Sequence, residues 1–484
     1  MARFTVSRLG RAMLFAGAAS LIAGPALADE LRDALILAYQ TNPTLQSARA
    51  QQRGVDEGVP IARAAGLPSL NGTVTYTEFV KTSANSFTSP SRAFDANSQL
   101  GVPIYSGGAV KNSVRAAETR VGAGRADLRG VESGVFSQVV AAYMDVILAQ
   151  EVVKLNRANV GRLEVNLQAG KDRFEIGDLT RTDVAQSQSR LSLARGQTRS
   201  AEANLIAARE RYIQVVGKAP VDLQAPPPLA GLPGSADEAV EIALDHNPDL
   251  LAARQRSKAA GYDVRVAGAG KLPRISLFAG ADYTDYLGTL GGSVPGQFTQ
   301  KSTTAQAGVR ASIPIFQGGL PAAQRRAAQA REDATLETEV GVERAVVANV
   351  RTAYAQWQAA QSLIGSSQVA VDAAALSLEG VRAENTVGNR TILDIHNAEN
   401  ELLTAQVQLA TAQRNAYVAG FNLLAAMGKA EARDLGLDGG ALYDPVANYD
   451  RVHRKIWDWS EDPEPKVDST RTVDTPAQDG SVTP

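Results

Sequence analysis

The chain has 484 residues, a formal net charge of −2 and no cysteine. The absence of cysteine excludes disulfides, zinc–thiolate sites and thiol nucleophiles, and the near-neutral charge gives no electrostatic case for binding nucleic acid. Only 5% of the residues are aromatic while alanine is abundant, which favours long helices packed through small side chains.

Residues 1–28 are predicted to be a secretory signal peptide. Three arginines form a basic start, residues 12–23 form an apolar stretch, and Ala26-Leu27-Ala28 provides a cleavage site of small residues. The mature protein is therefore expected outside the cytoplasm. No later apolar run reaches the length of about 18 residues that a transmembrane helix needs, so a membrane role would require β-strands.

The rest of the chain contains two copies of one sequence pattern. Asn42-Pro43 matches Asn247-Pro248 at an offset of 205 positions, and "GVPIYSGG" matches "SIPIFQGG" at an offset of 211. Chance does not hold one register over such a length, so the pattern indicates a tandem duplication. The change of offset places six extra residues in the second copy, between Leu70 and Gly101 or their equivalents.

Each copy is predicted to contain a helix, a strand hairpin, a long helix, a tip turn and a further helix. Repeat 1 spans residues 29–218, with its hairpin at about 69–105 and its tip turn at about 174–180. Repeat 2 spans residues 236–429, with its hairpin at about 274–316 and its tip turn at about 385–391. Three connecting segments complete the chain: a proline-rich linker (219–235), a tail (430–460) and a final segment (461–484) predicted to be disordered.

The helix lengths predict an elongated molecule. The first helix is expected from Pro43, behind an Asn42 cap, to about Gly66. The long helix of about 65 residues would measure about 98 Å, and the two shorter helices placed end to end about 92 Å. A bundle about 100 Å long follows, with hairpins at one end and tip turns at the other.

Both hairpins alternate between apolar and polar residues, which is typical of strands with two different faces. Four such strands cannot close a barrel, and lipid does not tolerate open edges. Membrane strands would therefore require several chains: a dimer would supply eight strands with a filled interior, and a trimer 12 strands with room for a lumen. The alternative is a soluble, edge-covered sheet on a coiled-coil protein.

The duplication, the "LPSL" and "LPRI" hairpin entries, the two hairpin exits and "VGNRTILDI" resemble the TolC family of outer-membrane channel proteins over roughly residues 30–430. The resemblance implies a homotrimer in the outer membrane. It would have a 12-stranded β-barrel of four strands per chain, a periplasmic α-helical barrel, and an equatorial region built from the linker and the tail. It also implies contact with outer-membrane lipid, a periplasmic adaptor and an inner-membrane transporter of the ABC, RND or a similar class.

The two tip turns allow a structural and a functional interpretation. Thr180 with Asp183, and Thr391 with Asp394, fit a T-x-x-D capping box, which explains these residues without any function. The resemblance instead implies a pore gate at Asp394, repeated as a carboxylate ring by the trimer. Rings of this kind select cations.

The resemblance assigns further roles near the turns. Arg390 would close the gate together with Thr182 and Asp183, and Asn397 occupies a second gate position where family members can carry an acid. Asn385 replaces a tyrosine found in some members, so the closing network is expected to differ. The adaptor-docking tips would be Ile176, Gly177, Asp178 and Leu179 in repeat 1, and Val387, Gly388 and Asn389 in repeat 2.

We expect no enzymatic activity, cofactor or metal site, because His246, His396 and His453 are isolated and show no metal-ligand spacing. The alternative function is a periplasmic adaptor or coiled-coil scaffold without a pore. Residues 442–459 resemble the ends of relatives associated with type I secretion, which favours protein export, while efflux of small toxic compounds stays open.

Overall fold

The computed structural model describes residues 30–81, 89–291, 297–437 and 442–482. The predicted signal peptide, residues 1–28, lies outside these ranges. The elements, in chain order, are α1 (Leu31–Thr41), α2 (Pro43–Asp56), α3 (Gly58–Ala64), β1 (Ser69–Glu78), β2 (Arg92–Tyr105), α4 (Ala109–Glu175), α5 (Arg181–Val216), α6 (Ala236–His246), α7 (Pro248–Gly268), the 3₁₀ turn η1 (Ala269–Lys271), β3 (Arg274–Asp285), β4 (Lys301–Ser312), α8 (Leu320–Thr386), α9 (Ile392–Ala426) and α10 (Pro445–Val452).

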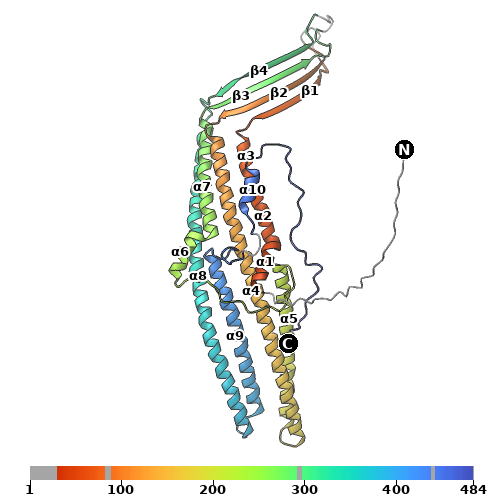
Figure 1. Cartoon of the computed structure of the whole chain (residues 1–484), viewed down its shortest axis with the longest axis vertical. Coiled ribbons are helices and arrows are strands. Elements are labelled where there is room, and N and C mark those ends of the chain that lie inside the picture. The colour runs from red at the N-terminus through yellow and green to blue at the C-terminus, as the bar shows by residue number, and fades with distance from the viewer. Residues whose placement is uncertain (1–29, 82–88, 292–296, 438–441, 483–484) are drawn as a thin grey trace, which may run out of the picture.

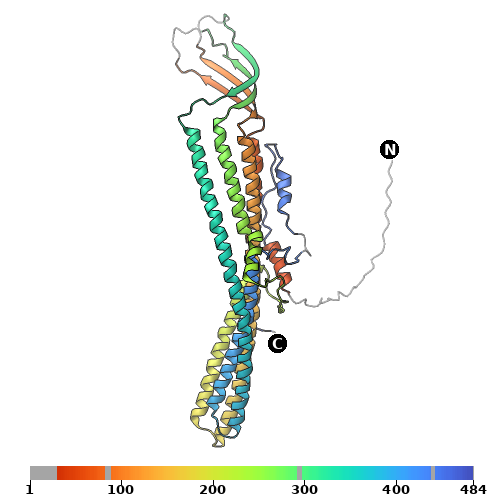
Figure 2. The ribbon, with the colours of Figure 1, turned by 90° about the vertical axis from the view of Figure 1, so that its left-hand side faces the viewer.

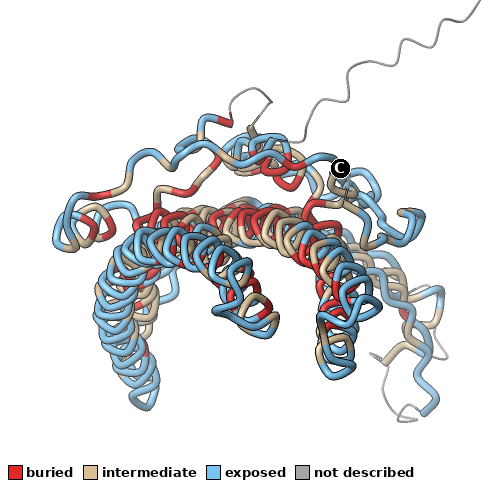
Figure 3. Tube along the Cα trace, turned by 90° about the horizontal axis from the view of Figure 1, so that it is seen from below, coloured by how far each residue is buried: buried red, intermediate tan, exposed pale blue. Residues whose placement is uncertain are grey.

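The molecule is a long rod with the sheet at one end and two helix turns at the other (Figure 1). Helices α4 and α8 contain 67 residues each, which corresponds to about 100 Å at 1.5 Å per residue. Seen along the rod, the helices form a curved wall, and the linker and C-terminal segments lie on its convex side (Figure 3).

The duplication is visible element by element. Helices α1 and α6 begin 205 positions apart, as do β1 and β3, whereas α4 and α8, like α5 and α9, begin 211 apart. The six extra residues of repeat 2 therefore lie within the hairpin, as predicted.

One predicted helix is divided in two. Instead of running from Pro43 to about Gly66, the chain breaks between α2 and α3 at Glu57. Pro60 explains the break, because it has no N–H for the Asp56 carbonyl and its ring clashes with that carbonyl. Repeat 2 has Arg265 at the equivalent position, and α7 continues without interruption.

The four strands form a single antiparallel sheet in the order β1-β2-β3-β4. The register aligns Leu70 with Leu100, Leu100 with Ala279, and Ala279 with Ala307, so these residues share one face. The opposite face carries Asn71, Thr73, Thr75, Asp95, Asn97, Gln99, Asp282, Thr284, Ser302, Thr304 and Gln306. The predicted alternation therefore extends over the whole sheet, with one apolar and one polar face.

The apolar face is uncovered in the single chain. Leu70, Val74 and Val309 are 72%, 69% and 66% exposed. Strands β1 and β4 have no strand partner on their outer edges within the described residues. A sheet with a bare apolar face and two open edges is not a stable end point in water.

The main core lies at mid-height, where helices α1, α2 and α4 to α9 meet the linker and residues 430–437. Tyr143 and Tyr212 pack there with ring centroids 6.4 Å apart, and the Tyr143 hydroxyl donates to the Gln224 carbonyl at 2.7 Å. Among the described helices only α4 contains a window apolar enough to cross a membrane, and 50% of that window is buried inside the protein. Such burial is typical of a core helix.

The tail departs from its predicted path. Residues 430–437 belong to the equatorial core, but α10 lies beside α2 and α3, closer to the sheet (Figure 1). Residues 461–482 contain no helix or strand, yet they are held against the rod. Arg209 donates to the carbonyls of Asp479 and Ser481 at 2.7 and 2.8 Å, and Arg157 donates to the Gly480 carbonyl at 3.0 Å. These arginines attach a segment whose composition predicted disorder.

A substitution at Gly428 would test the packing of the equatorial core. Gly428 has a φ of +74° and no room for a Cβ, which would collide with the backbone of His246 and Asn247. We expect Gly428→Ala to cost at least about 2 kcal/mol through overpacking and strain. Gly436→Ala is the matched control, since Gly436 has a φ of +62° but open space around it. Thermal unfolding followed by circular dichroism should give a clearly lower Tm for Gly428→Ala; equal Tm values would contradict this packing.

Candidate functional site

Both helix turns lie at the end of the rod opposite the sheet (Figures 1 and 2). Gly177 and Gly388 adopt φ angles of +85° and +84°, which glycine tolerates best. The Asp178 N–H donates to the Arg173 carbonyl at 2.9 Å, and the Asn389 N–H donates to the Glu384 carbonyl at 3.0 Å. The repeated sequence therefore produces two turns with the same hydrogen bonds.

The capping prediction is confirmed at both turns. The Asp183 carboxylate accepts from the Thr180 N–H at 3.0 Å and from its hydroxyl at 2.7 Å. The Asp394 carboxylate accepts from the Thr391 N–H at 2.9 Å and from its hydroxyl at 2.8 Å. These bonds lower the pKa of both carboxyl groups, through the side chain of Thr180 first for Asp183 and the backbone of Thr391 first for Asp394. Both aspartates are therefore anionic at neutral pH.

Each turn is also braced by an ion pair within its own hairpin. Arg173 contacts Asp178 at 3.0 Å, and Arg390 contacts Glu384 at 2.7 Å. Within one chain, Arg390 is thus paired with Glu384 instead of with Thr182 or Asp183, the partners that the resemblance implied. The reason is local: Glu384 lies on the same hairpin as Arg390, and Asp183 is engaged by Thr180.

The predicted docking residues form the outermost surface of the tip. Ile176 and Val387 are 80% and 70% exposed, although both are large and apolar. Leu179 is half-buried beside the turn. A built Cβ at Gly177 or Gly388 would meet nothing within 4 Å, so the backbone there is open to close approach.

Polar contacts join the α4–α5 hairpin to the α8–α9 hairpin near the tip. Asn397, the second predicted gate position, accepts a hydrogen bond from Arg190 of α5 at 3.3 Å. His396 is 4% exposed and contacts the Ser187 hydroxyl at 3.3 Å. Both contacts run from α9 to α5.

Glu399 is the centre of this connection and was not predicted. Its side chain is 1% exposed and accepts from Arg382 of α8 at 2.8 Å and from Asn166 of α4 at 3.2 and 3.3 Å. His396 Nδ1 lies 3.6 Å from its second oxygen, beyond normal hydrogen-bond length. Burial, the largest influence, raises the pKa of Glu399, but the contacts from His396, Arg382 and Asn166 together outweigh it and leave the pKa lowered.

The apolar cluster near the tip does not join the two hairpins. The apolar cluster nearest the turns contains Leu163, Leu167, Leu191 and Ala194, all from α4 and α5. Within the described residues, no member of that cluster comes from α8 or α9. Near the turns the described polar contacts between the two hairpins are hydrogen bonds, which separate at lower cost than an apolar core.

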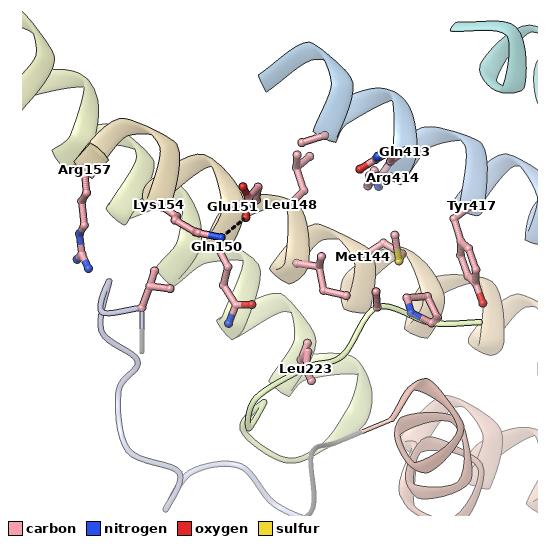
Figure 4. A pocket seen from close by; sticks show the side chains of 15 residues that line it. Met144, Leu148, Gln150, Glu151, Lys154, Arg157, Leu223, Gln413, Arg414 and Tyr417 are labelled. Carbon is pink, nitrogen blue, oxygen red and sulfur yellow. Dashed lines mark hydrogen bonds and ion pairs between the residues drawn. The ribbon is translucent and has the colours of Figure 1, made fainter. Parts of the chain in front are cut away.

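A hollow lies at the equator, away from the tip, and is shown in Figure 4. It has a volume of about 890 Å³ and is lined by Met144, Leu148, Leu223 and Tyr417. Burial raises the pKa of Tyr417 to about 12, so its hydroxyl stays protonated. Within the described residues, no group of three His, Asp or Glu side chains could hold a metal ion.

Known proteins share both the sequence pattern and the fold of this chain. The family model described as "Outer membrane efflux protein" matches residues 35–218 and 239–429, one match for each repeat. The chain belongs to this family. Its two matched regions coincide with the two copies found from the sequence.

Curated relatives agree with this assignment. The chain is 35% identical over 460 residues to the outer membrane efflux protein BepC of Brucella suis biovar 1 (strain 1330), covering 94% of this chain and 98% of BepC. It is 27% identical over 436 residues to the outer membrane protein TolC of Escherichia coli (strain K12), covering 87% of this chain and 86% of TolC. The resemblance stated from the repeats is therefore confirmed.

Solved structures support the fold. The crystal structure of the CmeC outer membrane channel of Campylobacter jejuni matches with a TM-score of 0.71 at 17% identity, covering 88% of this chain and 89% of CmeC. The predicted class, mainly helical with a small β portion, is confirmed. Family and relatives place the protein in the outer membrane as an exit channel, and nothing supports the adaptor or scaffold alternative.

Glu399 offers a test of the link between the hairpins. We expect Glu399→Gln to cost about 1–3 kcal/mol, because Arg382 and Asn166 lose a charged acceptor in a buried position. Glu401→Gln, on the same helix but exposed, is the control. Thermal unfolding at neutral pH should show a lower Tm for Glu399→Gln alone.

The pH dependence of that difference follows from the lowered pKa of Glu399. A carboxyl group whose pKa is lower in the folded protein stabilises it above the unfolded-state pKa, and this contribution is lost as the pH falls through the folded pKa. The Tm gap between wild type and Glu399→Gln should therefore be full at neutral pH and shrink below about pH 4. A gap independent of pH would show that the charge of Glu399 does not stabilise the tip.

Proposed function

We propose that three copies of this chain form one channel, with the sheets closing into a 12-stranded barrel in the outer membrane. The open edges of β1 and β4 support this, because lipid tolerates only closed sheets. The bare apolar face would contact lipid and the polar face would line the lumen. Two chains would supply only eight strands, whose interior side chains would fill.

The helices support the same assembly. Helix α8 has few buried residues compared with its repeat counterpart α4 and lies at one side of the curved wall (Figure 3). Its exposed apolar side chains include Leu363, Val369 and Leu376, at 52%, 68% and 70%. Packing against the next copy would bury these residues and continue the wall into a closed α-helical barrel in the periplasm.

The channel would be the exit duct of a tripartite export system. Its tips at residues 176–179 and 387–389 would dock a periplasmic adaptor, and an inner-membrane transporter of the ABC, RND or a similar class would supply the energy. The exposed apolar residues Ile176 and Val387, beside glycine turns open to close approach, support a docking role.

The gate would lie at the same end. Three copies of Asp394 around one axis would make a ring of carboxylates, with Asn397 next to it. While no adaptor is docked, Arg390 would contact Thr182 and Asp183 of a neighbouring copy and keep the gate closed. Within each copy, Glu399 joins the two hairpins. Docking would open the gate by separating hairpins that polar contacts hold together.

For the cargo, efflux of small toxic compounds has the more direct support, because BepC is named as an efflux protein. Type I protein secretion, which residues 442–459 favour, is the second candidate cargo for the same duct.

The decisive variant is Asp394→Ala in planar bilayers. The wild-type protein should form discrete channels that prefer cations, and Asp394→Ala should lose much of that preference because the carboxylate ring is gone. Asp172→Ala is the control: it removes an exposed carboxylate from α4 near the same end of the rod, outside the proposed gate, and should leave selectivity unchanged.

If Asp394→Ala channels kept the selectivity of the wild type, Asp394 would act only as a helix cap. No channels from folded oligomers would refute the duct itself.

A further inference from the structure

A short loop after α10 exposes three large apolar side chains. Ile456, Trp457 and Trp459 are 72%, 71% and 80% exposed. Two tryptophans so close together and so exposed are unusual in water, because tryptophan contributes strongly to burial whenever a surface is available. The sequence "RKIWDW" (454–459) therefore requires an explanation that the channel and its gate do not provide.

The loop is held in shape by its own charges. Arg451 makes two bonds to the Asp462 carboxylate, at 2.6 and 2.7 Å, and Lys455 adds a third at 3.2 Å. The Ser460 N–H donates to the Trp457 carbonyl at 3.1 Å, closing a turn between the tryptophans. These bonds hold the two ends of the loop together, and its apolar side chains are exposed to solvent.

Contacts to α2 and α3 fix the height of the loop on the rod. Asn448 of α10 donates to the buried Asp56 of α2 at 2.8 Å, and Arg63 donates to the His453 carbonyl at 2.7 Å. Arg63 lies in the last turn of α3, and β1 begins at Ser69. The chain beyond His453 therefore lies at the level where the helices end and the sheet begins (Figure 1).

The structure also defines on which side of the curved wall of helices the loop lies. The C-terminal segments lie on the convex side of the curved helices, away from the concave side that would face the lumen (Figure 3). A loop on the outside of the channel, directly below a membrane-embedded sheet, is at the depth of the lipid headgroups of the periplasmic leaflet. Tryptophan is enriched at this depth, where its ring is partly in the apolar layer and its N–H reaches water.

The loop carries no net charge that would select anionic lipid. Its basic residues Arg451, Arg454 and Lys455 are balanced by Asp458, Glu461 and Asp462. The contact must therefore rest on the aromatic and aliphatic side chains, with the mixed charges suited to zwitterionic headgroups.

We propose that residues 455–460 form an interfacial anchor that inserts Ile456, Trp457 and Trp459 into the periplasmic leaflet of the outer membrane. The partner is a zwitterionic phospholipid surface. The anchor is continuous with the lipid-facing side of the sheet and ties the C-terminal tail to the membrane. It rests on the membrane location of the sheet, not on the gate or the cargo.

The chain allows a direct test because it contains three tryptophans, Trp357, Trp457 and Trp459. A Trp357→Phe variant reports on the loop alone. A double Trp457→Phe, Trp459→Phe variant reports on Trp357, which lies in α8 about 56 Å below the start of that helix at 1.5 Å per residue. Both full-length variants are reconstituted into vesicles of phosphatidylcholine brominated near the top of the acyl chains, and into unbrominated vesicles.

The anchor predicts a large loss of fluorescence in brominated vesicles for the Trp357→Phe variant and none for the double variant. Acrylamide in the water should quench the loop tryptophans only weakly, because the leaflet would cover them. Loop fluorescence quenched by acrylamide but not by brominated lipid would overturn the proposal, because the loop would then face water. Loop fluorescence quenched by neither would also overturn it, because a neighbouring copy of the chain would then cover the tryptophans.

Discussion

The unpaired edges of β1 and β4 are the constraint on which the rest of the structure depends. Within one chain the sheet has two rows of backbone groups without strand partners, which lipid does not tolerate until the sheet closes, whereas its bare apolar face suits lipid. Closure requires further copies, and further copies create an axis. In the proposed trimer, that axis would turn the curved wall of helices into a tube and a single aspartate at the tip into a ring.

The two ends of the rod use different chemistry for this reason. The sheet and the equatorial core are built to stay together, through strand pairing and an apolar cluster around Tyr143 and Phe421. The tip joins its hairpins through Glu399, Asn397 and His396, with the nearest apolar cluster confined to α4 and α5. Polar links are specific in geometry but cost less to separate than a packed core, which suits an end that opens in the proposed gate.

Much of this architecture could be predicted from the sequence because it is local or repeated. The offset of the two copies, the period of the strands and the T-x-x-D caps each depend on a few neighbouring residues, and the structure has them where predicted. The break at Glu57 was also local, since Pro60 signals it. The Glu399 cluster was harder: Glu399 falls with Ile392, His396 and Leu403 on one stripe of α9, but its partners come from α4 and α8. The path of the tail depends on distant arginines, so composition alone predicted disorder for a segment that is held.

The central claim, that β1 of one copy pairs with β4 of the next, can be tested directly in a chain without native cysteine. Thr73→Cys in β1 is combined in turn with Thr304→Cys or Gln306→Cys in β4, on the same polar face, and oxidised in outer membranes. Within one chain these positions are three strand spacings apart, about 14 Å, too far for a disulfide. A closed barrel of three copies should give crosslinked dimers and trimers and nothing larger, with no crosslinks between copies that carry Thr73→Cys alone. A ladder beyond three copies, or no crosslink from any pair in folded protein, would contradict it.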